Sequence, residues 1–320
     1  MQIISDQNQT FFNEFFLLGF QNLQNFRIPV FILILIIYAI IMSGNIIIVF
    51  LVSKSHTLHS PMYFFLCHLS LCDILFTSNI VPTMLHVILK EGSSISHFCC
   101  LTQLQIFGSC GTAECYILTV MSYDRYLAIC DPLHYSTVMD FKRCISLVAL
   151  SWSFGFLFAL ISRVLLGGLQ FCHLNIIDHF FCDFLPLLEL SCSDTFIVEM
   201  EAFMVIPFIV LFPFVFVIVT YVYIFFTIFG ISSTTGRQKA FSTCSSHLTV
   251  VCLFYGTLIS IYLSPSRGNA LNINKFTSLF YTVVTPLFNP IIYSMRNKEI
   301  RKAVHVLFRE KRVRSMFSES

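Results

Sequence analysis

Long apolar stretches separated by short polar linkers make up most of the chain. A helix that crosses a bilayer needs about 20 mostly apolar residues, and seven stretches reach that length. The first, IPVFILILIIYAIIMSGNIIIVFLV, is apolar almost throughout, the second is weaker, and the third is interrupted by Gly, Ser and Thr. The stretches cover about 28–52, 61–88, 98–130, 143–166, 197–228, 239–263 and 274–295. This pattern predicts an all-α membrane protein built as a seven-transmembrane helix bundle.

Composition and linker lengths favour the same class. Of the 320 residues, 56% are hydrophobic and only 11% are charged, whereas soluble domains carry about 25% charged residues. The longest linker, between residues 167 and 196, is too short for a separate soluble domain. We therefore expect an amino-terminal segment (1–27), a bundle (28–295) and a carboxyl-terminal tail (296–320). The net charge of +2 is too small to indicate a nucleic-acid partner.

The distribution of Lys and Arg predicts the orientation, because cytoplasmic loops carry an excess of these residues. With the amino terminus outside, 14 of the 19 basic residues lie at cytoplasmic ends and five at outer ends. Asn8 opens an Asn-Gln-Thr glycosylation sequon on that outer side. Asp6 and Glu14 stand where a signal peptide would be basic, so we expect no cleaved leader.

The tail after Arg296 has features of a membrane-surface segment. Residues 297–308 predict a short amphipathic helix on the cytoplasmic side, with Ile300, Val304 and Leu307 on one face. The basic run Arg309–Arg314 follows it. Because the cytoplasmic leaflet is anionic, these bases should attract membrane lipid.

Five of the 13 cysteines fall on the predicted outer side, where an oxidising environment allows disulfides. Because five is odd, one of them should remain free or buried. The stretch His179-Phe-Phe-Cys182-Asp183 offers an alternative, since imidazole, thiolate and carboxylate all bind metals. A disulfide at Cys182 would remove that thiolate. The outer cysteines are Cys99, Cys100, Cys172, Cys182 and Cys192.

Short motifs along the whole chain match one family. In order they are FFLLGF (15–20), Gly44-Asn45, LHSPMYFFLCHLSLCD (58–73), MSYDRYLAIC (121–130), HFFCD (179–183), LSCSD (190–194), KAFSTCSSHL (239–248), FYGT (254–257) and PLFNPIIYSMRNKEI (286–300). With this ordered set the chain resembles a vertebrate olfactory receptor of class II, within the rhodopsin-like G protein-coupled receptors. It departs from the family pattern in MSYDRY for MAYDRY, PLFNP for PMLNP, and Cys99 for Gly.

The resemblance implies two disulfides on the outer side. Cys100, at the top of the third helix, should bond Cys182 in the long outer loop, and Cys172 should bond Cys192 within that loop. Two such bridges would restrict the loop and hold it as a lid over the bundle. Cys99 would then be the odd thiol, and as a neighbour of Cys100 it would compete for pairing.

The adjacent Asp124 and Arg125 raise a question, because a charge at the bilayer centre costs roughly 2.5–3.5 kcal/mol. They lie about 26 residues along the third helix, or about 39 Å at 1.5 Å per residue, and so at the cytoplasmic boundary. Spacing alone indicates a simple snorkelling anchor. The resemblance instead implies a switch facing a G protein, with Arg125 restrained by Asp124 until activation. The remaining residues of the implied switch are Tyr126, Tyr221, Asn289, Pro290 and Tyr293.

Two acids lie deeper in the spans. Asp73 and Glu114 fall inside the second and third stretches, where unpaired carboxylates are costly. The resemblance implies that they approach Asn45 and Asn289. Neighbouring acids would share a proton or hold a cation such as sodium, and a neutral hydrogen-bonded cluster is the alternative. We expect no other cofactor.

The resemblance puts the ligand in the outer half of the bundle. The side chains there are mostly apolar with a few hydroxyls, which favours a small, neutral, fairly hydrophobic volatile. Ordinary bundle packing is the alternative for each residue. The set comprises Phe107, Gly108, Gly111 and Thr112 on helix three, Val205, Ile206 and Ile209 on helix five, Tyr255, Leu258, Ile259 and Tyr262 on helix six, and Leu279 and Thr282 on helix seven.

The expected function is that of an odorant receptor in the plasma membrane, which activates a stimulatory G protein and raises cyclic AMP. The same fold sensing a non-volatile metabolite outside olfactory tissue is the nearest alternative. A transporter would show internal repeats or broken helices in matching halves. An enzyme would need a nucleophile and a base within a span. The sequence carries neither pattern, so we expect a receptor and no enzyme.

Overall fold

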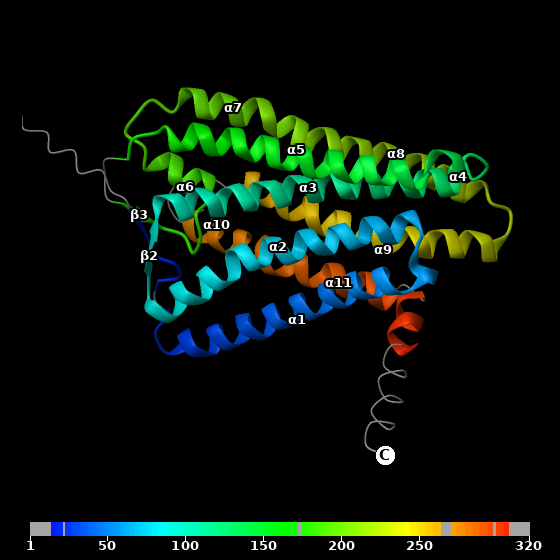
Figure 1. Cartoon of the computed structure of the whole chain (residues 1–320), viewed down its shortest axis with the longest axis horizontal. Coiled ribbons are helices and arrows are strands. Elements are labelled where there is room, and N and C mark those ends of the chain that lie inside the picture. The colour runs from blue at the N-terminus through cyan, green and yellow to red at the C-terminus, as the bar shows by residue number, and fades with distance from the viewer. Residues whose placement is uncertain (1–13, 22, 172–174, 264–269, 297–298, 307–320) are drawn as a thin grey trace, which may run out of the picture.

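The computed structural model describes residues 14–21, 23–171, 175–263, 270–296 and 299–306. Long helices run side by side along the long axis of the molecule (Figure 1). Among the described residues, seven helical segments occupy the seven predicted stretches. They are α1 (Arg27–Lys54), α2 (Pro61–Lys90), α3 (His97–Cys130), α5 (Phe141–Gly167), α7–η3–α8 (Phe196–Ile206, Pro207–Leu211, Phe212–Gly230), α9 (Thr234–Leu263) and α10–η4–α11 (Ala270–Leu279, Phe280–Val284, Thr285–Arg296).

Local sequence explains where several helices begin and end. α2 starts at Pro61, whose missing N–H belongs to the first turn, where it has no intrahelical partner. It ends at Glu91, which adopts a left-handed conformation with φ 55°. The Ser96 side chain caps α3 by accepting from the Cys99 N–H, and Asp140 caps α5 by accepting from the Arg143 N–H. Capping side chains satisfy N–H groups that the first turn leaves unpaired.

Two of the predicted helices contain a wider π-helical turn that the sequence pattern did not predict. The turn η3 begins at Pro207, and η4 is followed by Pro286. Proline has no N–H and cannot continue the regular bonding of an α-helix. Pro286 would otherwise donate to the carbonyl of Thr282, which lies inside η4. The hydrogen-bond register therefore changes next to a proline in both segments.

Apolar side chains cover the outside of the bundle. Leu33 and Ile36 of α1 are 57% and 52% exposed, and Phe226 of α8 is 74% exposed. Five helical segments among the described residues are long and apolar enough to cross a membrane: Gln24–Lys54, Pro61–Lys90, Phe141–Gly167, Phe196–Gly230 and Thr234–Ser260. An outward apolar surface of this extent fits a lipid solvent.

The predicted third and seventh spans are helical but are not among those five. α3 is central in the bundle and buries polar side chains such as Gln103, Gln105 and Glu114, which lower its hydropathy. The last segment is divided into α10, η4 and α11. α3 buries its polar groups against other helices, so an average over its sequence understates how well it fits an apolar environment. In the last segment, neither α10 nor α11 is by itself long enough to span a membrane.

A small three-stranded sheet lies at one end of the bundle, which we call the sheet end (Figure 1). The central strand β1 (Glu14–Leu17) pairs antiparallel with β2 (Ser93–Ser96) and parallel with β3 (Ile176–Ile177). Phe15 and Leu17 are buried in a small hydrophobic cluster between the sheet and the adjoining helix ends. Residues 14–17 are therefore an integral part of the fold.

Short helical elements fill the connections. They are η1 (Gln24–Phe26), η2 (His56–Leu58), α4 (Tyr135–Val138) and α6 (Phe184–Glu189). At the other end of the bundle, residues 299–306 are helical and turn away from the bundle axis (Figure 1). Ile300 and Ala303 of that helix pack against the main core. Asn8 and Leu307 lie outside the described residues.

Candidate functional site

Asp73 of α2 and Glu114 of α3 meet in the middle of the bundle. The Asn289 amide of α11 donates to both Asp73 carboxylate oxygens at 3.1 Å and to Glu114 Oε1 at 3.3 Å. All three side chains are buried. Asn45 is also buried, but its amide donates to the Ile41 carbonyl of its own helix. Two buried carboxylates cannot both carry an uncompensated charge, so this cluster requires a proton or a cation.

Arg125 lies at the opposite end of the bundle, which we call the Arg125 end. Its Nε donates to Asp124 Oδ2 at 3.0 Å, and Nη2 bonds the same oxygen. The Tyr135 hydroxyl of α4 donates to Asp124 Oδ1 at 2.8 Å. Burial and the neighbouring Asp124 carboxylate raise the pKa of Tyr135, so this hydroxyl keeps its proton and remains a donor. The Arg125 side chain is 12% exposed and Asp124 is fully buried, which shields the pair from water.

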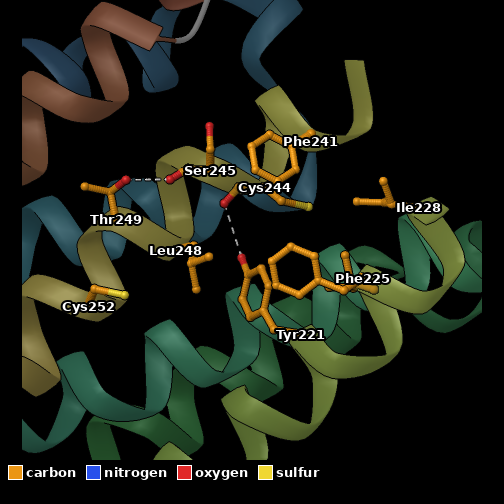
Figure 2. Close-up of a pocket in the computed structure, with 10 residues that line it drawn as sticks. Tyr221, Phe225, Ile228, Phe241, Cys244, Ser245, Leu248, Thr249 and Cys252 are labelled. Atoms are coloured by element: carbon orange, nitrogen blue, oxygen red, sulfur yellow. Dashed lines mark hydrogen bonds between the residues drawn. The ribbon is translucent and has the colours of Figure 1, made fainter. Parts of the chain in front are cut away.

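Tyr221 of α8 contacts α9 near this pair. Its hydroxyl lies 2.7 Å from His247 Nδ1 and 3.5 Å from the Cys244 carbonyl oxygen. Figure 2 shows Tyr221 pointing from α8 toward α9, beside a crevice between the two helices. Tyr221, His247 and the buried Tyr293 of α11 all lie within electrostatic range of Arg125. Of the implied switch residues, Tyr221 and Tyr293 therefore lie near Arg125, and the Tyr221 hydroxyl is bonded to His247 and not to the guanidinium.

Two other residues of the implied switch, Pro290 and Tyr126, lie in different parts of the bundle. Pro290 lies inside α11, one residue after Asn289 of the acidic cluster. Tyr126 faces α8, where its ring centroid lies 6.1 Å from that of Tyr223, an exposed residue. Tyr126 therefore lies toward the outside of the bundle, away from the Arg125–Asp124 pair.

Tyr255 of α9 is fully enclosed where α3, α8 and α9 meet. Its ring centroid lies 4.9 Å from that of Phe214 and 5.3 Å from that of Phe254. Its hydroxyl lies beside Cys115 and Thr119 of α3. A group that touches three helices at once is well placed to sense a change in any of them.

Phe107 of α3 belongs to an aromatic cluster in the half of the bundle nearest the sheet. Its ring centroid lies 5.1 Å from Phe76, 5.3 Å from Phe181 and 6.0 Å from Tyr281. A Cβ on Gly111, one turn further along, would lie 2.9 Å from the Tyr281 hydroxyl oxygen. Gly111 therefore faces the bundle interior and makes room for Tyr281.

Two residues of the expected ligand set do not face that interior. A Cβ on Gly108 would lie 3.1 Å from Ala159 Cβ of α5, so Gly108 permits close packing of α3 on α5. Ile259 is 41% exposed and shares an outward stripe of α9 with Cys252 and Gly256, seven and three residues before it. The expectation that these two positions line the interior is wrong.

The rest of the expected set is distributed over the helices around the interior. Thr112 and Thr282 are buried, and the Thr282 hydroxyl donates to the Ser278 carbonyl of the same segment. Ile209, Leu258 and Leu279 are partly buried against the main core. Val205 and Ile206 are partly buried, and the Tyr262 side chain lies outside the described part of the chain.

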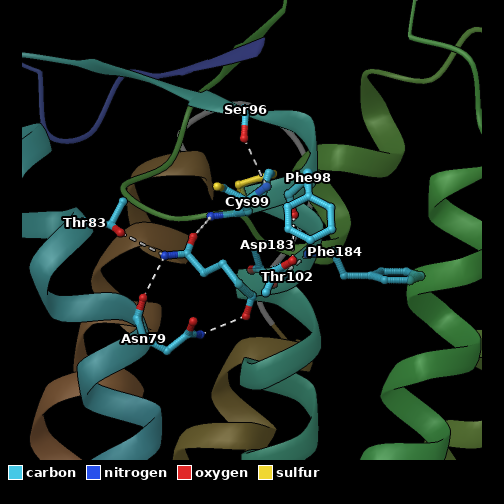
Figure 3. The surroundings of a disulfide bond; sticks show 11 residues. Asn79, Thr83, Ser96, Phe98, Cys99, Thr102, Asp183 and Phe184 are labelled. Carbon is cyan, nitrogen blue, oxygen red and sulfur yellow. Dashed lines mark hydrogen bonds between the residues drawn. A yellow bond between two sulfur atoms is a disulfide. The ribbon is translucent and has the colours of Figure 1, made fainter. Parts of the chain in front are cut away.

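The disulfide between Cys100 and Cys182 joins the start of α3 to the segment between β3 and α6. Gln103 holds the same segment through hydrogen bonds: the Cys182 N–H donates to Gln103 Oε1 at 2.9 Å. Gln103 Nε2 in turn donates to the Asn79 carbonyl and to Thr83 Oγ1. Figure 3 shows Asn79 and Thr83 on α2 facing α3 below the disulfide. α2, α3 and the loop are thus tied at one place.

The other outer cysteines differ in whether they form a disulfide. Cys99 is exposed and free, beside the disulfide in Figure 3. Cys192 is disulfide-bonded, and its expected partner, Cys172, lies outside the described residues. Free Cys99 agrees with its expected role as the odd thiol.

Lys275 of α10 ties the sheet to the helix bundle. Its Nζ lies 2.5 Å from Asp178 Oδ1 and donates to the Gly19 carbonyl oxygen at 3.1 Å. The Gly19 N–H donates to the His179 carbonyl at 3.0 Å. The Lys275 side chain is 6% exposed, whereas Asp178 is 39% exposed. One buried ammonium therefore holds the amino-terminal segment, the loop after β3 and the start of the last helical segment together.

The stretch 179–183 does not fit a metal site. Cys182 is in the disulfide and offers no thiolate. The His179 ring is buried, with centroids 4.5 Å from Phe180 and 4.6 Å from Phe181. Burial, together with the charge of Lys275, lowers the pKa of His179 to about 3. His179 is therefore a neutral side chain packed among aromatic rings.

Several residues that organise these sites were missed by the sequence analysis: Gln103, Tyr135, His247 and Lys275. Each is one polar side chain in or beside an apolar stretch. The sequence signals only that such a group needs a partner in an apolar environment. It does not identify the partner, which comes from another helix or loop.

Comparison with known proteins identifies the class. The profile of the family described as "Olfactory receptor" matches residues 34–311. Olfactory receptor 11L1 from Homo sapiens is 45% identical over 305 residues, which cover 95% of this chain and 95% of that protein. Olfactory receptor 5P68 from Mus musculus is 44% identical over 304 residues, which cover 95% and 97%. The chain belongs to the olfactory receptor family and is a multi-pass membrane protein.

Proposed function

We propose that this chain is an odorant receptor of the plasma membrane with seven spans and its amino terminus outside. Residues 1–27 would lie outside, 28–295 would form the receptor bundle, and 296–320 would lie in the cytoplasm. The excess of Lys and Arg at the Arg125 end supports this orientation. So does the disulfide at the sheet end, because disulfides persist in oxidising compartments. The helix at 299–306 would rest on the cytoplasmic membrane surface.

The ligand would be a small, mostly apolar volatile bound in the half of the bundle nearest the sheet. The aromatic rings of Phe107 and Tyr255 would provide apolar contacts, and the hydroxyls of Thr112 and Thr282 would orient it. The Lys275 ammonium of α10 is already paired with Asp178 of the lid, so this charge is not free for a carboxylate ligand. This arrangement supports a neutral ligand.

The output would be activation of a stimulatory G protein and a rise in cyclic AMP. The observation that carries this proposal is the buried Arg125–Asp124 pair, held further by Tyr135 at the Arg125 end. A ligand that binds better when the pair is open would shift the population toward that arrangement. Arg125 would then contact the G protein. Pro290 gives α11 a place to bend during the change.

A sodium ion near Asp73 and Glu114 is part of the proposal. Carboxylate and amide oxygens suit a hard cation, and the two buried acids need a compensating charge. Sodium chloride should raise the thermal stability of the purified receptor above that in choline chloride, and Asp73→Asn should remove the difference. Equal stability of the native chain in both salts would favour a shared proton or a neutral cluster.

The central test is a cyclic AMP assay with an olfactory-type stimulatory G protein over a panel of neutral volatiles. Arg125→Ala should abolish a dose-dependent response at unchanged surface expression. Tyr255→Ala should shift ligand potency by about tenfold, a moderate loss for a buried aromatic contact. Ile259→Ala, on the outward stripe, is the matched control and should leave potency unchanged. A full response from Arg125→Ala would overturn the switch.

A receptor for a non-volatile metabolite is the second candidate, because the same pocket chemistry accepts neutral apolar molecules in general. The assay separates the two when neutral metabolites are run beside the volatiles. A response to metabolites alone, still lost with Arg125→Ala, would keep the receptor mechanism and replace the ligand class.

A further inference from the structure

A crevice between α8 and α9 at the Arg125 end is unrelated to the proposed odorant pocket. Its volume is about 290 Å³, and Figure 2 shows side chains from both helices around it. The α8 side includes Ile224, Phe225 and Ile228, and the α9 side includes Phe241, Leu248 and Cys252. Both helices expose apolar side chains to the outside, Phe226 and Phe241 among them. The crevice therefore lies where the bundle meets membrane lipid.

The polar groups in the crevice wall are occupied by the protein itself. The Thr249 hydroxyl donates to the Ser245 carbonyl at 2.7 Å, and the Ser245 hydroxyl donates to the Ser242 carbonyl at 3.1 Å. The Tyr221 hydroxyl bonds His247. A wall whose donors are already engaged favours an apolar occupant, because a polar one would lose its hydrogen bonds to water without replacement.

The length of the crevice matches one leaflet. Phe241 and Cys252 are 11 residues apart on α9, which is about 16 Å at 1.5 Å per residue. One leaflet contributes about half of a hydrocarbon core that is roughly 30 Å thick. An extended acyl chain of one leaflet would therefore run along the crevice from one end to the other.

A positive charge stands at the end of the crevice where a lipid headgroup would be. Arg237 lies four residues before Phe241, on the same face of α9. Its Nη2 donates at 2.9 Å to the carbonyl of Ile231, the residue that follows α8. A guanidinium has five N–H donors and this bond uses one. None of the other guanidinium donors of Arg237 has a hydrogen-bond partner among the described residues, so they could bind a phosphate in the bidentate manner typical of Arg.

We propose that the α8–α9 crevice binds one acyl chain of an anionic phospholipid, with the lipid phosphate on Arg237. In the orientation proposed above, this lipid comes from the cytoplasmic leaflet, which is the anionic one. The acyl chain would fit the crevice in the arrangement in which Tyr221 of α8 is bonded to His247 of α9. Binding would therefore stabilise this arrangement of the two helices relative to any other.

The test is photo-crosslinking in nanodiscs with phosphatidylserine or phosphatidylcholine that carries a diazirine in one acyl chain. Crosslinks are mapped by mass spectrometry to the crevice peptide containing Leu248 and Cys252. The reference is a peptide of α5 with the lipid-facing Leu150 and Phe156. Phosphatidylserine should label the crevice peptide about fivefold more than phosphatidylcholine, the factor expected for one basic residue at an anionic surface. Labelling of α5 should be equal. Both leaflets carry the same lipid, so the result does not depend on orientation or on signalling.

Two variants make the test decisive. Arg237→Gln should reduce crevice labelling by phosphatidylserine to the phosphatidylcholine level, whereas Arg301→Gln, on an exposed part of the helix at 299–306, should not. Leu248→Trp should fill the crevice and remove its labelling by both lipids while α5 stays labelled, which also reports that the variant is folded. Equal labelling of crevice and α5 by the two lipids, or an Arg237→Gln variant that labels like the native chain, would overturn the proposal.

Discussion

At the sheet end, segments far apart in the chain are joined by backbone hydrogen bonds, a disulfide and the ion pair between the buried Lys275 and the partly exposed Asp178. At the Arg125 end, contacts between helices include single side-chain hydrogen bonds, such as those of Tyr135 with Asp124 and of Tyr221 with His247. The contacts at the sheet end cannot change partners unless the sheet or a covalent bond breaks. The side-chain hydrogen bonds at the Arg125 end can change partners at a cost of about 1 kcal/mol for each bond. The difference indicates one end that is held fixed and one that can rearrange.

The largest expected effect concerns the covalent part of the fixed end. Cys100→Ser removes the bond to Cys182 and should cost about 2–5 kcal/mol of stability, enough to abolish surface expression measured by flow cytometry. Cys99→Ser, one residue away and free, is the matched control and should be expressed normally. Normal expression of Cys100→Ser would mean that the sheet and Gln103 hold the lid without the disulfide.

Replacing one partner of the ion pair between Lys275 and Asp178 should lower the free energy of unfolding more than replacing the other. Asp178→Asn leaves the Lys275 ammonium buried and without its carboxylate, which should lower the free energy of unfolding by about 3 kcal/mol. Lys275→Met leaves a carboxylate that is 39% exposed and open to water, so it should cost less. Thermal unfolding of both purified variants tests the order. A larger loss for Lys275→Met would show that the Asp178 carboxylate, and not the ammonium, depends on the pair.

The lid should also make stability depend on pH through His179. Its pKa is about 3 in the folded chain and about 6.5 when unfolded. Between these values the unfolded state binds more protons, so the free energy of unfolding falls as pH decreases from 6.5. The loss at pH 5 should be about 2 kcal/mol. His179→Leu should remove this part of the pH dependence in thermal unfolding.

Asp183 titrates in the same experiment, because desolvation raises its pKa, but it is present in both chains and cancels in their difference. The same pH slope in the native chain and in His179→Leu would show that His179 is not the group responsible.

The smallest effect is expected at the Arg125 end. Tyr135→Phe removes one hydrogen bond to the Asp124 carboxylate, worth about 1.5 kcal/mol because the acceptor is charged. If Asp124 restrains Arg125 as proposed, basal cyclic AMP per surface receptor should rise by up to about tenfold. His134→Ala is the control, because His134 pairs with Asp131 on the exposed surface, where ion pairs contribute little. Unchanged basal activity in Tyr135→Phe would show that this bond does not hold the resting state.

The sequence predicted the helices well because their signal is local. Twenty apolar residues in a row predict a span wherever they occur, and α1, α2 and α5 begin and end within two residues of the predicted bounds. Strand β1 was not predicted, since its four residues, EFFL, form a strand only because β2 and β3 lie on either side. Its conformation depends on partners that no local pattern contains.

The site was predictable only in part for the same reason. Family motifs indicated Asp124, Arg125 and the cluster of Asp73 and Glu114. The geometry of these groups depends on neighbours on the same helix or on adjacent helices. The motifs did not fix which way a residue faces. Gly108 faces α5 and Ile259 faces outward, because the rotation of a helix about its axis is set by packing against several others. One sequence gives the positions along a helix but not that rotation.

Strand β1 has a consequence for biosynthesis. Leu17 pairs with Ile177, so the segment made first cannot complete its sheet until about 160 further residues have been added. At 5–20 residues per second, that delay is roughly 8–30 s. During this time the apolar Phe15 and Leu17 have no native cover, while the first spans are already being inserted. Assistance from a chaperone would therefore be needed earliest at the amino terminus, although that segment is among the last to reach its final place.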